Sequence, residues 1–199
     1  MEDISLEQKV NDLLQSDAIT PATRNAFEKR IKKASGSNHF FSDDLFRLLS
    51  VVCDRLMDQD SENRLVNVAL FIDDRLVKND CDGWRYDEMP PDAEMLQMGL
   101  RGIDETAFEM FGQKFISLSD EQQIESLTAI QQDTAPGNIW KSLRAARFFE
   151  DLLAEATEIF FSYPAVQLKI KYAGMADAKG WKNIGLGESE KTEKWMEGS

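Results

Sequence analysis

The stretch AARFFEDLLAEATEIF, residues 145–160, decides the fold class of this chain. Its apolar residues recur every three or four positions, which is the spacing of one face of an α-helix. They are Ala145, Phe148, Phe149, Leu152, Ala156, Ile159 and Phe160. This apolar stripe is wider than one neighbouring helix needs, so we expect a central helix that contacts several others.

Four earlier segments repeat the helical spacing of apolar residues. They are Leu45 to Leu56, Leu65 to Leu76, Leu96 to Phe111 and, more weakly, Ile124 to Gln131. Alternation of β-branched residues with period two, the mark of a strand, is scarce. The sequence therefore predicts an all-α protein, a single helical domain of about six or seven helices that ends in an irregular aromatic segment.

Capping residues agree with these helices. Ser42 precedes two acids, and Ser119 with Gln122 forms a capping-box pattern. Pro21 follows Thr20 and suits the first position of a helix. Ser35-Gly36-Ser37-Asn38 is a plausible hinge. We expect an N-terminal helical extension at 1–36, a helical domain at 37–187 and a charged tail at 188–199.

The net charge of −13 is concentrated in the middle of the chain. Residues 41–138 hold 21 acidic and 8 basic residues, whereas the flanking parts are balanced. Nucleic acid is therefore not an expected partner, because binding to phosphates needs a basic surface. Acidic helix faces in solvent are the simplest explanation, and a basic partner surface is the alternative. No apolar run is long enough to span a bilayer.

Residues that perform chemistry are scarce. His39 is the one histidine, and no serine elbow or metal-type pair accompanies it. Cys53 lies in an apolar run and Cys81 among acids, so we expect two free thiols. The sequence contains no glycine-rich dinucleotide loop and no P-loop. We therefore expect no catalytic residues, no metal site and no flavin or nicotinamide site in this chain.

Three acidic motifs have structural explanations that we favour over functional ones. Asp80-Cys81-Asp82-Gly83 resembles part of a calcium loop, but the flanking ligand positions are wrong, so a tight turn is preferred. Glu105 and Glu109 share a helix face without the histidines of a metal bundle. Asp54-Arg55 and Asp73-Asp74-Arg75 can form ion pairs between helices.

The C-terminal segment carries aromatic residues among glycines and a proline. Such a segment is costly to order and suits the covering of another surface. We expect Phe161, Tyr163, Tyr172 and Trp181 to anchor a partner interface. The alternative for each ring is that it closes the core of this chain.

An ordered series of motifs over residues 40–187 resembles the gluconate 2-dehydrogenase subunit 3 family. The series comprises Phe40-Phe41-Ser42, Asp54-Arg55-Leu56, Val68 to Asp73 with Arg75-Leu76, Gly99-Leu100, Phe111 to Phe115, Leu118-Ser119 with Gln122-Gln123, Phe148-Phe149, Tyr163 to Val166, Tyr172 to Gly174 and Gly180-Trp181. The chain departs from the family pattern at Met57, where a proline is usual, and at Ala165-Val166-Gln167, where many relatives have Gly-Gly-Asn.

The resemblance implies a non-catalytic accessory subunit that binds, stabilises or helps mature a flavin-dependent oxidoreductase of the glucose–methanol–choline type. FAD is expected on that large subunit, and a cytochrome often completes such complexes. Many relatives carry an export signal, whereas Met1-Glu2-Asp3-Ile4-Ser5 is acidic. Periplasmic location by co-export with a partner and cytoplasmic location both stay open. The alternative function is a stand-alone helical module that binds a small ligand between its helices.

Overall fold

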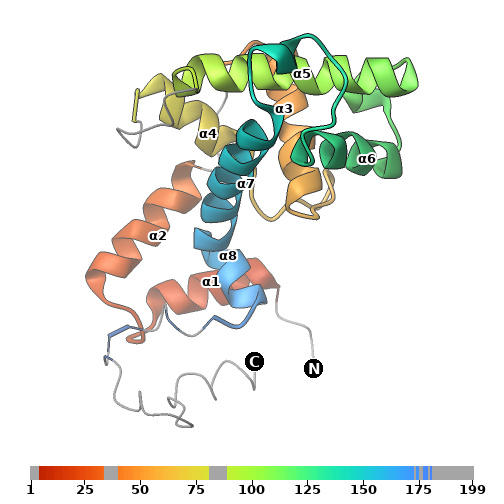
Figure 1. Cartoon of the computed structure of the whole chain (residues 1–199). Helices are drawn as coiled ribbons and strands as arrows, with labels where there is room; N and C mark the ends of the chain where they lie inside the picture. The colour runs from red at the N-terminus through yellow and green to blue at the C-terminus, as the bar shows by residue number, and fades with distance from the viewer. Residues whose placement is uncertain are drawn as a thin grey trace, which may run out of the picture. The chain divides into compact units, whose positions relative to one another are not determined.

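The computed structural model describes residues 5–33, 40–80 and 89–172, together with 174, 177, 178 and 180. These residues form α-helices and short 3₁₀ helices (Figure 1), and the described part contains no strand. The elements are α1 (Leu6–Gln15), α2 (Pro21–Lys33), α3 (Asp43–Leu56), α4 (Val68–Val77), α5 (Asp92–Phe111), η1 (Phe115–Ser117), α6 (Asp120–Gln131), η2 (Ile139–Lys141), α7 (Ala145–Ser162) and α8 (Pro164–Lys169). The predicted all-α class is confirmed.

The described residues contain eight α-helices, where the sequence predicts about six or seven. The short helix α8 lies inside the segment that we expected to be irregular. Pro164 starts this helix, because a proline at the first helical position needs no hydrogen bond from its nitrogen. The helix α4 begins at Val68, so Leu65 precedes it and lies in a loop held by Gln59, which accepts from the Leu65 amide at 3.0 Å.

The chain divides into two compact units, residues 36–159 and residues 1–35 with 160–199. The C-terminal segment thus groups with the N-terminal helices, which periodicity along the chain does not reveal. Our predicted boundaries at 36/37 and 187/188 stay a prediction, and the tail from 188 onward lies outside the described residues.

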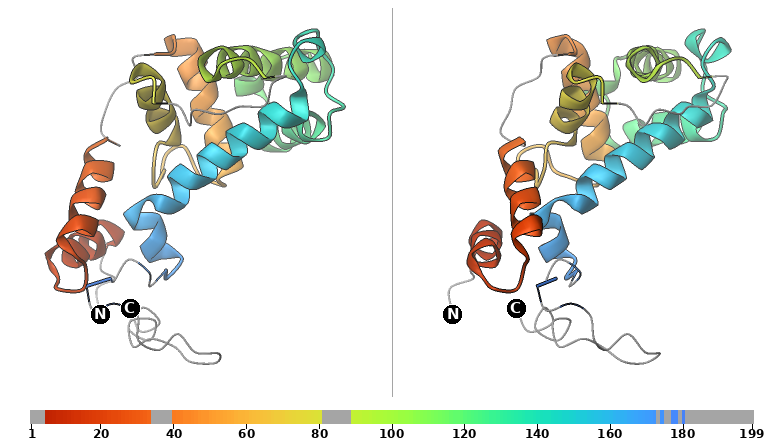
Figure 2. Two further views of the ribbon diagram at one scale, coloured as in Figure 1. Left: turned by 60° about the vertical axis from the view of Figure 1, so that its left-hand side comes forward. Right: turned by 90° about the vertical axis from the view of Figure 1, so that its left-hand side faces the viewer.

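In the unit of residues 36–159, α5 and α3 cross and α6 packs beside α5 (Figures 1 and 2). Two glycines let aromatic rings approach the backbone of α5 closely. A Cβ on Gly99 would lie 2.0 Å from the ring of Phe148, and one on Gly102 would lie 2.6 Å from the ring of Trp140. The Trp140 indole also donates to Thr106 at 2.7 Å. These contacts position α7 and η2 against α5.

The helix α7 contacts α4 as well as α5, as the wide apolar stripe predicts. Glu155 on α7 pairs with Arg75 on α4 at 2.6 Å, and Arg75 also reaches Asp92 on α5 at 2.7 Å. Desolvation lowers the pKa of Arg75, but the hydrogen bonds that its guanidinium donates to both carboxylates outweigh this effect, and the net pKa is raised. Arg75 and its two carboxylate partners therefore form an ion-pair cluster that joins α4, α5 and α7.

The two acid–arginine motifs form some of the ion pairs between helices that we expected. Arg55 on α3 forms an ion pair with Asp120 on α6, which confirms a link between helices. Asp54 pairs with Arg64 in the following loop, with a 2.6 Å bond from the arginine Nε. Asp73 accepts hydrogen bonds from the backbone amides of residues 40 and 41, at about 3 Å. The Asp73 carboxylate thereby fixes the backbone that leads into α3.

The predicted caps are present. Ser42 and Ser119 cap α3 and α6, the latter through a complete capping box with Gln122. Pro21 is the first residue of α2. Five helices are followed by a residue with positive φ, of which only Gly112 is a glycine. The others are Asp58, Asn79, Asp133 and Lys171.

Candidate partner interface

The structure describes three of the four predicted interface residues. Phe161 is 45% exposed and Tyr172 is 52% exposed, whereas Tyr163 is half-buried. Burial, and secondarily the charge of Glu7, raises the pKa of the Tyr163 hydroxyl. Trp181 lies outside the described residues. Two of the rings are therefore available to a partner, and the third is partly used within its own unit.

The helix α8 rests on the N-terminal helices through a small apolar core. Ala165 and Leu168 of α8 pack against this cluster, which is formed by Val10, Leu13, Leu14, Ile19 and Phe27 of the N-terminal segment. Leu13 and Phe27 are only 2% and 3% exposed. The N-terminal helices thus form the support on which the aromatic segment lies.

Asp177 ties the end of this segment to the start of α2. Its carboxylate accepts from the Thr20 amide at 2.7 Å, from the Thr20 hydroxyl at 3.0 Å and from the Thr23 hydroxyl at 2.6 Å. The amide of Ala178 donates to the carbonyl of Ala18 at 3.0 Å. Desolvation raises the pKa of Asp177, but the hydrogen bonds from Thr23 and Thr20 together lower it. The Thr20 hydroxyl accepts from the Thr23 amide at 3.3 Å, as an N-cap does, and Asp177 holds both threonines in place from more than 150 residues away.

A second set of bonds fixes the backbone that carries the two exposed rings. The Gln167 side chain donates to the carbonyl of Phe161 at 3.1 Å, and the Gln167 carbonyl accepts from the amide of Tyr172 at 2.9 Å. The Tyr172 ring covers Gly174, since a Cβ there would lie 2.3 Å from the ring. The chain reverses at Lys171 in a left-handed conformation. Phe161 and Tyr172 are therefore linked through Gln167 by bonds to their backbone groups.

Sequence reasoning missed Gln167, Ile170 and Asp177. Ile170 is 52% exposed and lies two residues before Tyr172. Ile170 lies at the end of α8, and the sequence did not predict this helix. The role of Asp177 carries no local signal, because its partners are distant in sequence. In the sequence, Gln167 stands out only as a departure from the family pattern.

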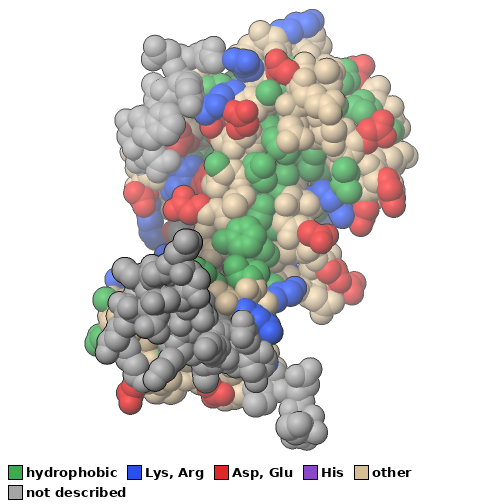
Figure 3. Space-filling view, turned by 60° about the horizontal axis from the view of Figure 1, so that its bottom comes forward, with side chains coloured by type: hydrophobic (Ala, Val, Ile, Leu, Met, Phe, Trp, Pro, Cys, Tyr) green, Lys and Arg blue, Asp and Glu red, His purple; other side chains and the backbone are tan. Residues whose placement is uncertain are grey.

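The negative charge of the chain belongs to one of the two units. Residues 36–159 hold 25 acidic and 11 basic residues, whereas residues 1–35 and 160–199 together hold 11 acidic and 12 basic ones. Charged side chains of both signs and an apolar group near the middle of the view are visible on the face in Figure 3. The aromatic segment therefore belongs to the unit without excess negative charge.

The other candidate residues have structural roles where the structure describes them. Cys53 is a buried free thiol in α3, as expected, and burial followed by the charges of Glu155 and Asp54 raises its pKa. Glu105 caps η2, because its carboxylate accepts from the amide of Ile139 at 3.0 Å. Hydrogen bonds from the backbone of residues 138 and 139 lower its pKa. Glu109 is exposed.

Predictions for His39, Cys81 and the Asp80–Gly83 turn fall wholly or mainly outside the described residues. Among the residues that are described, no three His, Cys, Asp or Glu side chains are grouped so that they could hold a metal ion.

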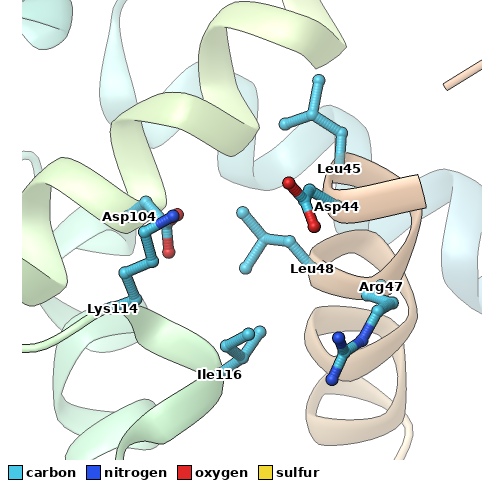
Figure 4. Close-up of a pocket in the computed structure, with 7 residues that line it drawn as sticks. All are labelled: Asp44, Leu45, Arg47, Leu48, Asp104, Lys114 and Ile116. Carbon is cyan, nitrogen blue, oxygen red and sulfur yellow. The ribbon is translucent and has the colours of Figure 1, made fainter. Parts of the chain in front are cut away.

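A small pocket lies between α3 and the segment from α5 to η1 (Figure 4). It is lined by Asp44, Leu45, Arg47, Leu48, Asp104, Lys114 and Ile116. The carboxylate of Asp104 is engaged there, since it accepts from the amide of Phe115 at 3.1 Å. The volume of about 150 Å³ is below the range of roughly 300–1,000 Å³ that organic ligands occupy. This pocket gives little support to the alternative of a small-ligand module.

No helix in the described ranges combines the length and apolar character needed to cross a membrane. Comparison with known proteins gave one finding: the family model described as gluconate 2-dehydrogenase subunit 3 matches residues 43–187. No curated protein and no solved structure matches the chain. The matched region includes the helical core and the aromatic C-terminal segment, and it begins after α1 and α2. Because the family model matches well over half of the sequence, the chain belongs to the gluconate 2-dehydrogenase subunit 3 family.

Proposed function

We propose that this chain is a non-catalytic accessory subunit that binds and stabilises, or helps mature, a flavin-dependent oxidoreductase. The partner is a large subunit of the glucose–methanol–choline type that carries FAD and oxidises a sugar, sugar acid or alcohol. A cytochrome subunit can complete the complex. Membership of the subunit 3 family supports the role of a subunit.

The observation that carries the proposal is the presence of two half-exposed rings, Phe161 at the end of α7 and Tyr172 just after α8, whose backbone groups both bond to Gln167. A backbone that is held before binding loses little conformational freedom on docking. Large aromatic side chains also contribute most of the energy at protein interfaces. An aromatic pair of this kind therefore suits the binding of a protein surface.

The proposal is tested by co-expression of the tagged chain with a flavoprotein of the glucose–methanol–choline type from the same genome. We expect the two proteins to co-purify with a flavin absorbance spectrum, and the chain purified alone to bind no flavin and reduce no dye acceptor. Failure of the flavoprotein to co-purify, or flavin-dependent dye reduction by the chain alone, contradicts the proposal.

The interface is tested with Phe161→Ala combined with Tyr172→Ala. We expect affinity for the flavoprotein to fall about tenfold or more, which corresponds to about 1.4 kcal/mol, with little change in melting temperature. The matched control is Phe108→Ala, because Phe108 is 61% exposed but lies on α5 in the other unit. Equal loss of binding in both variants would show that the C-terminal segment has no special role.

A further inference from the structure

Three exposed apolar side chains and two lysines flank the short helix α8. Phe161 precedes the first residue of this helix, and the other four residues lie at its last residue or just after it. Phe161, Ile170 and Tyr172 are 45%, 52% and 52% exposed. Lys169 and Lys171 flank Ile170 and are also exposed. We call these five residues the C-terminal patch. Of the seven large hydrophobic side chains that are exposed in the described part of the chain, three belong to this patch.

Gln167 holds the backbone of the patch at two points. Gln167 bonds to the carbonyl of Phe161 and the amide of Tyr172, which links the two ends of the patch. Leu168 on the same helix packs into the cluster beneath α8. The patch is therefore ordered before any partner arrives, a condition that favours specific docking.

The charge of the patch contrasts with that of the rest of the chain. No ion pair to Lys169 or Lys171 is formed by the described residues. The unit of residues 36–159 has an excess of 14 acidic residues, so a carboxylate-rich surface is repelled by it. The same surface is attracted by the two lysines. The charge of the patch therefore favours a carboxylate-rich partner surface over a basic one.

From these contacts we infer that the C-terminal patch docks into an apolar pocket rimmed by carboxylates on the partner protein. The apolar side chains fill the pocket, and the ammonium groups of Lys169 and Lys171 lie against the acidic rim. This inference rests on the proposed function, and it specifies the chemistry of the partner surface. A protein is a better match than an anionic membrane, because two lysines contribute only about 2 kcal/mol at a lipid surface and the chain as a whole is strongly acidic.

The test is the double charge reversal Lys169→Glu with Lys171→Glu, measured with the co-expressed flavoprotein at several salt concentrations. We expect affinity at low salt to fall at least tenfold, and the weakening of binding by salt to diminish or reverse sign. The matched control is Lys29→Glu with Lys32→Glu, two exposed lysines of α2 in the same unit. We expect this control to change affinity less than threefold. Melting temperatures of both variants verify that the fold is intact.

Several outcomes overturn the inference. If charge reversal leaves affinity and salt dependence unchanged while loss of Phe161 and Tyr172 abolishes binding, the rim is not acidic, although the proposed function stands. If the flavoprotein never binds, both the inference and the proposed function fail. Charge-sensitive binding to phosphatidylserine vesicles with unchanged binding to the flavoprotein assigns the patch to a membrane. A dimer in sedimentation that the lysine reversal dissociates, without an effect on the flavoprotein, assigns it to a second copy of the chain.

Discussion

The substitution Gly99→Ala tests the packing that fixes α7 on α5. A methyl group at this position would lie 2.0 Å from the Phe148 ring, whereas ordinary contacts of a Cβ begin at 3.4 Å. The ring must therefore retreat by more than an ångström. The ring is 1% exposed and its centroid lies 5.8 Å from that of Trp140, and Leu96 and Leu100, on the same helix as Gly99, are fully buried. The core offers no space into which the ring can move without displacing other side chains.

Two effects oppose each other in this variant. Alanine is favoured over glycine in a helix by about 1 kcal/mol, which alone would stabilise α5. Overpacking of a filled core costs about 1–3 kcal/mol, and more when the backbone must shift. Since a ring lies directly in the path of the methyl group, we expect a net loss of about 2 kcal/mol, or a melting temperature lower by about 4–8 °C.

Thermal and denaturant unfolding measure the effect. The control is Arg101→Ala, an exposed position on the same helix, where we expect a change within about 0.5 kcal/mol. In the Gly99→Ala background, Phe148→Leu should recover part of the loss, because the smaller side chain leaves room for the methyl group. A melting temperature that rises or stays constant in Gly99→Ala would refute the packing described for this position.

Three further predictions concern a cap, a carboxylate and a thiol. Ser119→Ala removes the capping box of α6 and should cost about 1 kcal/mol in denaturant unfolding, whereas the exposed Ser117→Ala should be neutral; equal effects would contradict the cap. The folded-state pKa of Asp177 is lowered, so its stabilisation is present above the unfolded pKa of about 3.9 and is lost as pH falls through the folded value. The protection of amides at the start of α2 against hydrogen exchange, corrected for the intrinsic rate at each pH, should fall in acid, and Asp177→Asn should remove that pH dependence; an unchanged protection profile counts against the contact. Cys53 is buried with a raised pKa, so it should react with thiol reagents only after unfolding; rapid labelling of Cys53 in the folded protein would contradict its burial.

Sequence reasoning succeeded where structure depends on neighbouring residues. The helices from α3 to α7 follow the three- and four-residue spacing of apolar side chains, and Ser42, Ser119 and Pro21 mark their starts as predicted. Helix ends were harder to predict. Asp58, Asn79, Asp133 and Lys171 adopt the left-handed conformation that glycine adopts most easily. A search for glycine therefore finds only one of these five ends, at Gly112.

The candidate interface was predicted only in outline. Phe161 and Tyr172 are exposed as an interface requires, but Tyr163 is half-buried and Trp181 lies outside the described residues. Ile170 follows the last residue of α8 and is also exposed. The sequence did not indicate this helix, because six residues are too few to give a clear periodic signal. In the sequence, the apolar residues of the cluster that supports α8 look like the core of an isolated pair of helices.

The sequence by itself determined the all-α class, the family, the main helices and the absence of familiar cofactor motifs, because each depends on local spacing or on residue types in order. Only the tertiary structure decided that the C-terminal segment belongs with α1 and α2, and that Asp177 binds Thr20 and Thr23 at the start of α2, near the other end of the chain. These properties arise from contacts between residues far apart in sequence, where closing the chain costs entropy and no short pattern records the partner.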